Sequence, residues 1–128
     1  TSSSYGTIDR KTVLEPEDDA AIVNWGGAWR MPTYEECKEL KDNCTWIYTA
    51  DYKGTGVGGL IGISNFNANF VFIPGDNNKQ YYSSTLGGSS SYVAYVFYVL
   101  NKSSFYINAD NTETHKRYKG NYIRPVCE

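Results

Sequence analysis

The sequence has few of the residues on which most metal and hydrolytic sites depend. Its 128 residues include one histidine, His115, and three cysteines, Cys37, Cys44 and Cys127. A zinc site requires several histidine or cysteine ligands close together. A Ser-His-Asp triad would have to use His115 together with a G-x-S-x-G turn that the sequence does not contain. We therefore expect neither a zinc site nor serine-hydrolase chemistry.

Long apolar runs and basic clusters are also missing. The longest apolar run, 92–100, is too short to cross a membrane, which takes about 20 residues. Its β-branched and aromatic residues indicate a buried strand instead. The net charge is −2, and no basic cluster is longer than Lys116-Arg117, whereas nucleic-acid binding requires a basic face. These features argue against a membrane-spanning protein and against a nucleic-acid partner.

Only part of a calcium loop is present. Calcium-dependent lectins use Glu-Pro-Asn or Gln-Pro-Asp together with Trp-Asn-Asp, and neither set occurs in this sequence. Asn108, Asp110 and Thr112 alternate like oxygen ligands, but no acidic residue closes the loop as in an EF-hand. We therefore predict no cofactor, with calcium as the metal alternative.

Tyrosine, by contrast, is abundant. The chain has 12 tyrosines against five phenylalanines and three tryptophans, and it is rich in glycine, serine and asparagine. Binding surfaces favour this mixture, because tyrosine gives a large contact area at low entropy cost and small polar residues adapt to the partner. An all-β protein with many turns uses the same residues. Composition alone leaves both interpretations open.

Two helices are expected in the first third of the chain. Residues 15–25 begin with a proline and several acids, which suit the start of a helix, and Gly26-Gly27 ends this segment. Thr33 and Glu36 have the spacing of a capping box. Apolar positions at three- and four-residue steps then continue a second helix to Asn43.

The rest of the chain is predicted to form strands and turns. The expected strands, taken from β-rich runs between turn residues, are 45–50, 60–64, 69–73, 81–84, 92–100, 104–108 and 121–127. Helices precede strands, which favours the α+β class over alternating α/β. No repeat or linker divides the chain, so we expect one domain over 1–128, alone or as a C-terminal fragment of a longer chain.

The cysteines allow a disulfide between the second helix and the end of the chain. If the helix runs to Asn43, the Cα atoms of Cys37 and Cys44 lie roughly 10 Å apart, whereas a disulfide requires less than about 7 Å. Those two residues therefore cannot pair with each other, and either could pair with Cys127. The alternative is three reduced core cysteines.

Four blocks of the sequence resemble one protein family. They are Asp18-Asp19-Ala20-Ala21, the segment 24–33 with its Trp-Gly-Gly-x-Trp-Arg-Met-Pro-Thr pattern, Asn43-Cys44-Thr45-Trp46, and Ile123-Arg124-Pro125-Val126-Cys127-Glu128. They resemble the Fibrobacter-succinogenes-type paralogous domains, surface proteins common in gut Bacteroidetes such as Bacteroides. These are similar in fold to the formylglycine-generating-enzyme branch of the C-type lectin superfamily. Residues 82–85 also resemble that family, although a tryptophan is usual in place of Tyr82. Segment 51–80 departs from the usual pattern.

The resemblance implies a secreted protein, often a lipoprotein, on the bacterial outer surface. It also implies a disulfide that ties the second helix to the last strand, with Cys44 as the partner of Cys127. Related domains are the variable proteins of diversity-generating retroelements, whose C-terminal segment forms the ligand-binding surface; here it would run over 92–122. The enzymes of the branch use a cysteine pair near a substrate groove. Because we expect Cys37 and Cys44 on the helix and away from such a groove, we predict no enzymatic activity.

Together these observations predict a C-type-lectin-like α+β domain, with two helices packed on a twisted antiparallel sheet and long polar loops. We expect core or near-core positions for Trp25, Trp29, Tyr34, Leu40 and Trp46, and pairing of Arg30 and Arg124 with the acids of the first helix. The predicted ligand-binding residues lie in the C-terminal half: Tyr92, Tyr95, Tyr98, Phe105, Tyr106, Asn108, Asp110, Asn111, Glu113, His115, Lys116 and Tyr118.

The expected partner is a protein or carbohydrate ligand on another cell, bound by a monomer or by part of a larger surface protein. The alternative function is a fixed structural or adhesin module of a bacterial surface fibre. Both functions agree with the fold class and with the composition, and the identity of the ligand does not follow from the sequence.

Overall fold

The computed structural model describes residues 11–75, 79–87, 93–100, 104–108 and 120–127 of the chain. In chain order the elements are α1 (Ala20–Trp25), β1 (Trp29–Arg30), α2 (Tyr34–Asn43), β2 (Cys44–Thr49), the 3-10 turn η2 (Tyr52–Gly54), β3 (Gly59–Ser64), β4 (Phe70–Pro74), β5 (Lys79–Leu86), β6 (Ala94–Leu100), β7 (Ser104–Asn108) and β8 (Val126–Cys127). The α+β class and the two helices are confirmed.

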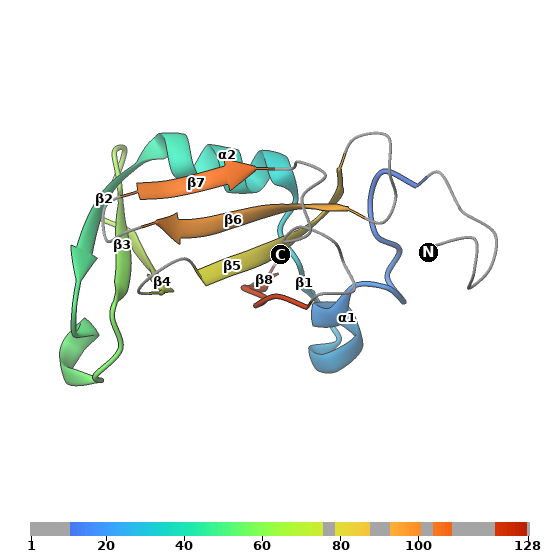
Figure 1. The fold of residues 1–128 in the computed structure, drawn as a ribbon, viewed down its shortest axis with the longest axis horizontal. Coiled ribbons are helices and arrows are strands. Elements are labelled where there is room, and N and C mark those ends of the chain that lie inside the picture. The colour runs from blue at the N-terminus through green and yellow to red at the C-terminus, as the bar shows by residue number, and fades with distance from the viewer. Residues whose placement is uncertain (1–10, 76–78, 88–92, 101–103, 109–119, 128) are drawn as a thin grey trace.

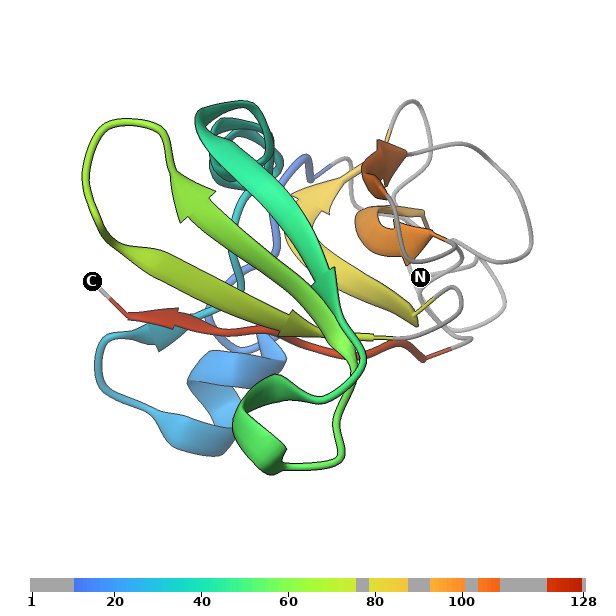
Figure 2. The same ribbon diagram turned by 90° about the vertical axis from the view of Figure 1, so that its left-hand side faces the viewer.

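The strands form three small antiparallel sheets instead of the single sheet predicted. The orders are β1-β8, β2-β3-β4 and β5-β6-β7. Helix α2 lies along the β5-β6-β7 sheet, while β2-β3-β4 stands at one end of it (Figure 1). Figure 2 shows β2-β3-β4 towards the viewer, with the loop between β3 and β4 beside the end of α2. Helix α2 therefore has one sheet along its length and another at its C-terminal end.

Helix α1 is shorter than predicted because its cap lies within the expected helix. Asp19 is extended, and its Oδ1 accepts hydrogen bonds from the backbone N–H groups of Ala21 (2.8 Å) and Ile22 (3.2 Å). A side chain that satisfies the first free N–H groups sets the start of a helix. Gly26 ends the helix with φ 65°, a conformation that glycine adopts without strain.

Helix α2 begins and ends where the sequence predicts. The Thr33 hydroxyl accepts from the Glu36 N–H (3.2 Å), and a Glu36 carboxylate oxygen accepts from the Thr33 N–H (2.8 Å). Arg30 donates to both carboxylate oxygens of Glu36, at 2.8 and 2.6 Å. The predicted pairing of Arg30 with the acids of the first helix is therefore wrong, because strand β1 directs this side chain to the first turn of α2.

The Arg30–Glu36 pair predicts acid sensitivity. The Arg30 hydrogen bonds lower the pKa of Glu36 from 4.5 to about 2. A lowered pKa in the folded state stabilises the protein above pH 4.5, and this contribution is lost as the pH falls towards 2. We expect Glu36→Gln to lower the free energy of unfolding at pH 7 by about 1 kcal/mol, because the half-exposed pair is screened by solvent.

Urea denaturation between pH 2 and 7 measures this effect. The difference between wild type and Glu36→Gln should shrink below pH 4, while the exposed neighbour variant Glu35→Gln should show no such convergence. A constant difference across the range would contradict the assignment of the acid-sensitive contribution to Glu36.

The main core lies between α2 and the two larger sheets. Its buried members are Cys37, Leu60, Ile73, Tyr81 and Phe97, against which Leu40, Trp46 and Tyr48 pack. The β2-β3-β4 register places Tyr48, Leu60 and Ile73 side by side in one row, as the alternation of strand side chains requires. The near-core predictions for Leu40 and Trp46 are confirmed.

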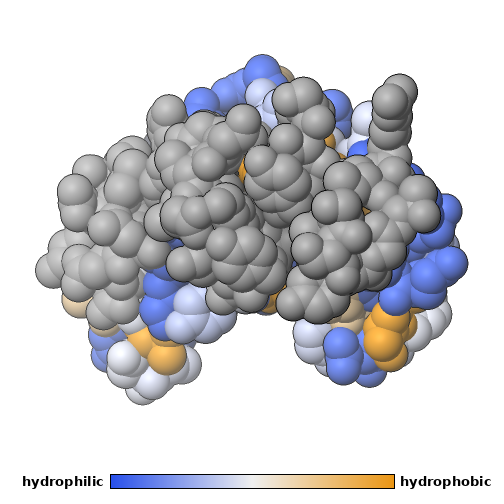
Figure 3. Space-filling view, turned by 45° about the vertical axis from the view of Figure 1, so that its right-hand side comes forward, coloured by the Kyte–Doolittle hydropathy of each residue, from blue (hydrophilic) through white to orange (hydrophobic). Residues whose placement is uncertain are grey.

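Two tryptophans predicted to be core residues are largely exposed. The exposed fractions are 58% for Trp25, the last residue of α1, and 43% for Trp29 in β1. Within the described part of the chain, the two-residue strand β1 pairs with β8 alone, in a sheet of two strands. On the face shown in Figure 3, the described residues are mostly hydrophilic, with small separate hydrophobic spots.

The predicted last strand, 121–127, is also shorter in the structure. Only Val126–Cys127 pairs, with Trp29–Arg30, and Tyr122 adds an isolated bridge to Tyr81. Pro125 interrupts the segment between them, because proline has no N–H group to donate to a neighbouring strand.

Candidate functional site

A groove of about 440 Å³ opens between the C-terminal half of α2 and the β3–β4 hairpin. We call it the hairpin groove; it is lined by Glu36, Glu39, Leu40, Asn43, Cys44, Gly62, Ser64, Phe66, Asn67, Asn69, Phe70 and Val71. Its volume lies within the range of roughly 300–1,000 Å³ that is typical of ligand sites. It combines apolar and polar lining groups, as such sites do.

Glycine at position 62 shapes the inner part of the hairpin groove. A Cβ atom on Gly62 would lie 2.6 Å from two atoms of the Trp46 ring, so the bare backbone lets the indole lie against strand β3. The indole N–H of Trp46 donates to the Lys41 carbonyl of α2 (3.2 Å). Trp46 therefore links the helix to the hairpin beside the groove.

Hydrogen bonds fix the loop between β3 and β4. The Asn65 N–H donates to the carbonyl of Asn43, the last residue of α2 (2.9 Å), and the Thr45 hydroxyl donates to the Asn65 side chain (2.7 Å). Within the loop, the Ser64 hydroxyl accepts from the Phe66 N–H (3.2 Å) and the Asn67 side chain from the Asn69 N–H (2.8 Å). The helix C-terminus thus anchors the wall of the hairpin groove.

Two aromatic rings stand on this anchored hairpin with much of their surface in solvent. Phe66 is 78% exposed and Phe70 is 54% exposed. Single exposed apolar residues are common on protein surfaces. Here Phe66 lines the hairpin groove and Phe70 separates it from a second groove, and the loop that carries Phe66 is held in place by backbone and side-chain hydrogen bonds. The rings are therefore presented in a defined geometry.

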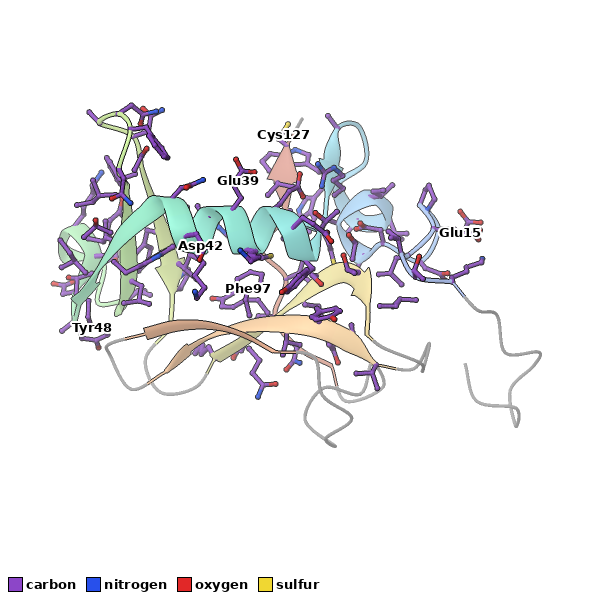
Figure 4. All side chains as sticks on the ribbon, turned by 90° about the horizontal axis from the view of Figure 1, so that it is seen from above. Glu15, Glu39, Asp42, Tyr48, Phe97 and Cys127 are labelled. Carbon is purple, nitrogen blue, oxygen red and sulfur yellow. The ribbon has the colours of Figure 1, made fainter. Side chains whose placement is uncertain are left out.

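Polar groups beside the rings are available to a ligand. Within the described residues, the side chains of Glu39, Asn43 and Asn69 make no hydrogen bond or ion pair. Figure 4 shows Glu39 extending from α2 on the side away from Phe97, which points from β6 towards the helix. The groove therefore offers a carboxylate and two amides next to apolar ring surfaces.

A second groove of about 380 Å³ lies on the other side of Phe70, over the outer face of β2-β3-β4. Lys53 places its ammonium 5.3 Å from the Tyr52 ring centre and 5.2 Å from that of Phe70. Its φ of 51° is unusual for a residue with a side chain. Tyr52 in turn stacks on Phe72, with ring centres 4.0 Å apart. We call this the sheet-face groove; its lining is mostly apolar with one cation.

The position of Cys44 differs from the sequence prediction. Cys44 is the first residue of β2, not part of α2, and it lines the hairpin groove. Burial raises the pKa of its thiol, and burial raises that of Cys37 to about 12. A raised pKa keeps a thiol protonated and unreactive at neutral pH. All three cysteines are thiols in the structure, so the disulfide between Cys44 and Cys127 is not formed there.

These environments predict different alkylation rates at pH 8. Cys37 is 3% exposed, whereas Cys127 is an exposed residue of β8. In the native protein we expect iodoacetamide to modify Cys127 and to leave Cys37 unmodified, as measured by peptide mass spectrometry. Equal rates would contradict the burial of Cys37. If the native protein takes no label, and the protein unfolded without reductant takes one label at Cys37, then Cys44 and Cys127 are joined by a disulfide.

The structure describes few of the ligand-binding residues predicted in the C-terminal half. Tyr95 is half-buried, with its ring centre 4.4 Å from that of Tyr34 on α2, so its ring contributes to packing. Tyr98 lies in β6, and Phe105, Tyr106 and Asn108 lie in β7. The side chains of these four residues are outside the described part, as are Tyr92, Asp110, Asn111, Glu113, His115, Lys116 and Tyr118.

Sequence reasoning missed the aromatic residues of the hairpin groove. The asparagine-rich composition of 65–68, between the predicted strands 60–64 and 69–73, predicts only a turn. A phenylalanine inside such a turn could have indicated a binding residue, because turns at the surface seldom require a large apolar side chain. The contribution of α2 to the groove could not be found in this way, since it depends on the packing of distant segments.

Two further findings concern the described residues. In this part of the chain, no helix has the length and apolar composition needed to cross a bilayer. Among the same residues, no three histidine, cysteine, aspartate or glutamate side chains are grouped as a metal site would require.

Comparison with protein-family models, curated proteins and solved structures gave no match.

Proposed function

We propose that this chain is a non-catalytic ligand-binding domain and that the hairpin groove forms part of its binding surface. The observation that carries the proposal is the exposure of Phe66 and Phe70 on a hairpin anchored to α2. Aromatic side chains at central positions supply much of the binding energy at many interfaces. A loop that is already ordered binds at a lower entropic cost than a flexible one.

The groups that line the hairpin groove favour binding over catalysis. The Cys44 thiol has a raised pKa, opposite to the shift that activates a nucleophilic cysteine. Glu36 has a pKa of about 2 and is held by Arg30, so it is a poor general base or acid near neutral pH. The remaining polar groups are amides, a hydroxyl and the Glu39 carboxylate, which suit hydrogen bonding to a ligand.

We also propose a C-type-lectin-like arrangement for this domain, secreted or displayed on a bacterial surface. The sequence pattern of 24–33 supports this assignment, as does the combination of two helices near the start of the chain with small antiparallel sheets. The ligand is a protein or a glycan on another cell. In this proposal the C-terminal segment 92–122 contributes a second part of the binding surface, as in the variable proteins that the sequence resembles.

Array binding of the purified domain tests the proposal. The wild type is compared on glycan and cell-surface-protein arrays with Phe66→Ala, with a chain whose segment 108–118 is replaced by Gly-Ser, and with Val23→Ala. Val23 is 63% exposed on α1 and serves as a matched apolar control. We expect Phe66→Ala to weaken binding at least tenfold, which corresponds to about 1.4 kcal/mol, and Val23→Ala to leave it unchanged.

The other outcomes assign the binding surface elsewhere or reject it. Loss of binding only in the segment replacement would place the surface at the C-terminal segment and remove the hairpin groove from it. No binding on either array would contradict the ligand-binding function and favour the alternative of a fixed structural or adhesin module.

A further inference from the structure

We infer that the hairpin groove binds a neutral sugar unit of a glycan, an inference that rests on the binding function proposed above. A sugar ring has a face of C–H bonds and a rim of hydroxyl groups. The faces of aromatic rings carry partial negative charge and attract polarised C–H bonds. Phe66 provides such a ring beside the groove, on a hairpin held by hydrogen bonds to α2. Phe70 borders the groove as well, with its ring beside the Lys53 ammonium on the sheet-face side.

The polar groups of the groove match the hydroxyl rim of a sugar. Glu39 accepts hydrogen bonds, and the Asn43 and Asn69 amides both donate and accept them. Within the described residues these three side chains have no other hydrogen-bond partner. A hydroxyl group can donate to the carboxylate and accept from an amide. The set therefore suits a ligand with several adjacent hydroxyl groups.

The charges of the groove favour a neutral ligand over an acidic one. Among the described residues that line it, the charged ones are Glu36 and Glu39. Arg30 neutralises Glu36, so Glu39 leaves a net negative charge that repels an acidic sugar. A cationic side chain could approach Glu39, but it would leave the amides of Asn43 and Asn69 without the multiple hydroxyl partners that a sugar offers. Lys53, which would attract an acid, lies in the sheet-face groove beyond Phe70.

Binding to immobilised neutral hexose and N-acetylhexosamine oligosaccharides tests this inference, followed by titration calorimetry with the oligosaccharide that binds best. We expect Phe66→Ala to weaken binding at least tenfold and Asn69→Ala about fivefold. Glu39→Gln keeps the shape of the side chain and one acceptor but loses the stronger charge-assisted hydrogen bond. We therefore expect it to weaken the affinity for the oligosaccharide about threefold. Val23→Ala and Lys53→Ala should leave the affinity unchanged.

Salt dependence separates a sugar from a cationic ligand. Raising the ionic strength from about 0.1 M to about 1 M shortens the Debye length from about 10 Å to about 3 Å. Binding of a neutral oligosaccharide should stay within twofold over this range. Binding to lysine-rich peptides that falls with salt and is abolished in Glu39→Gln would overturn the inference in favour of a cationic peptide.

The remaining outcomes distinguish this inference from the proposed function. Binding to acidic glycans that depends on Lys53, or no binding to any glycan, would overturn the inference. If Phe66→Ala then still abolished binding on the protein array, the proposed function would stand with a protein ligand. Neutral-glycan binding that is unchanged in Phe66→Ala and Asn69→Ala would overturn both the inference and the assignment of the hairpin groove.

Discussion

Replacement of Asp19 by alanine is expected to lower the free energy of unfolding by about 3 kcal/mol. Asp19 is 3% exposed, and besides capping α1 it accepts a hydrogen bond from the Met31 N–H through Oδ2 (2.9 Å). Loss of a helix cap costs about 1 kcal/mol, and an unsatisfied buried N–H costs about 1–3 kcal/mol more. One carboxylate thus joins α1 to the segment that enters α2, and its loss affects both.

Urea denaturation of three variants separates the two contributions of Asp19. Asp19→Ser keeps a capping oxygen but cannot reach Met31. It should therefore lower the free energy of unfolding by about half as much as Asp19→Ala. The neighbouring exposed residue provides the control, and Asp18→Ala should change the stability by no more than about 0.5 kcal/mol. Equal, small effects of Asp18→Ala and Asp19→Ala would contradict the bridging role of Asp19.

Local sequence patterns were sufficient for the elements that depend on short-range interactions. Helix α2 begins at the predicted capping box of Thr33 and Glu36, whose hydrogen bonds form between residues three apart. The β-rich runs between turn residues placed β3 and β4 within one residue, because asparagine, glycine and proline end a strand through their own local conformation.

The predictions that were wrong concern features that depend on contacts between distant segments. Asp19 caps α1 four residues after the predicted start because its second oxygen is held by Met31. Arg30 donates hydrogen bonds to Glu36 and not to the acids before α1, because the pairing of β1 with β8 fixes the position of this residue. Trp25 and Trp29 are apolar in sequence but exposed in the structure, and only the arrangement of whole elements decides which apolar residues are covered.

The same limit explains why the hairpin groove was not predicted. The resemblance predicts binding in 92–122, and the composition of 65–68 predicts only a turn between two strands. The groove arises because the Asn65 N–H binds the last carbonyl of α2 and places Phe66 beside Leu40 and Glu39. No local pattern specifies that Asn65, in a turn between two strands, will meet Asn43 at the end of a helix.

Replacement of Gly59 by alanine is expected to destabilise the fold by about 3 kcal/mol. A Cβ atom at this position would overlap the Ile73 carbonyl oxygen of the neighbouring strand and would lie 2.8 Å from the Phe72 ring. Relief requires β3 and β4 to separate where Leu60 pairs with Ile73, and both of these residues are 1% exposed in the core. Overpacking of a tight site costs about 1–3 kcal/mol, and a clash with backbone lies at the upper end.

Gly58→Ala and a double mutant make this prediction specific. At Gly58 a new Cβ would lie 3.0 Å from the Tyr48 hydroxyl and 3.3 Å from the carbonyl oxygens of Thr49 and Ala50. The Tyr48 side chain can shift and the backbone contacts are longer than at Gly59, so the free energy of unfolding should fall by about 1 kcal/mol or less. Combining Gly59→Ala with Phe72→Ala removes the ring but leaves the Ile73 carbonyl in place. Because the backbone contact is the one that cannot move, the double mutant should recover little stability relative to Phe72→Ala alone. Full recovery would show that the ring, not the neighbouring strand, requires glycine at position 59.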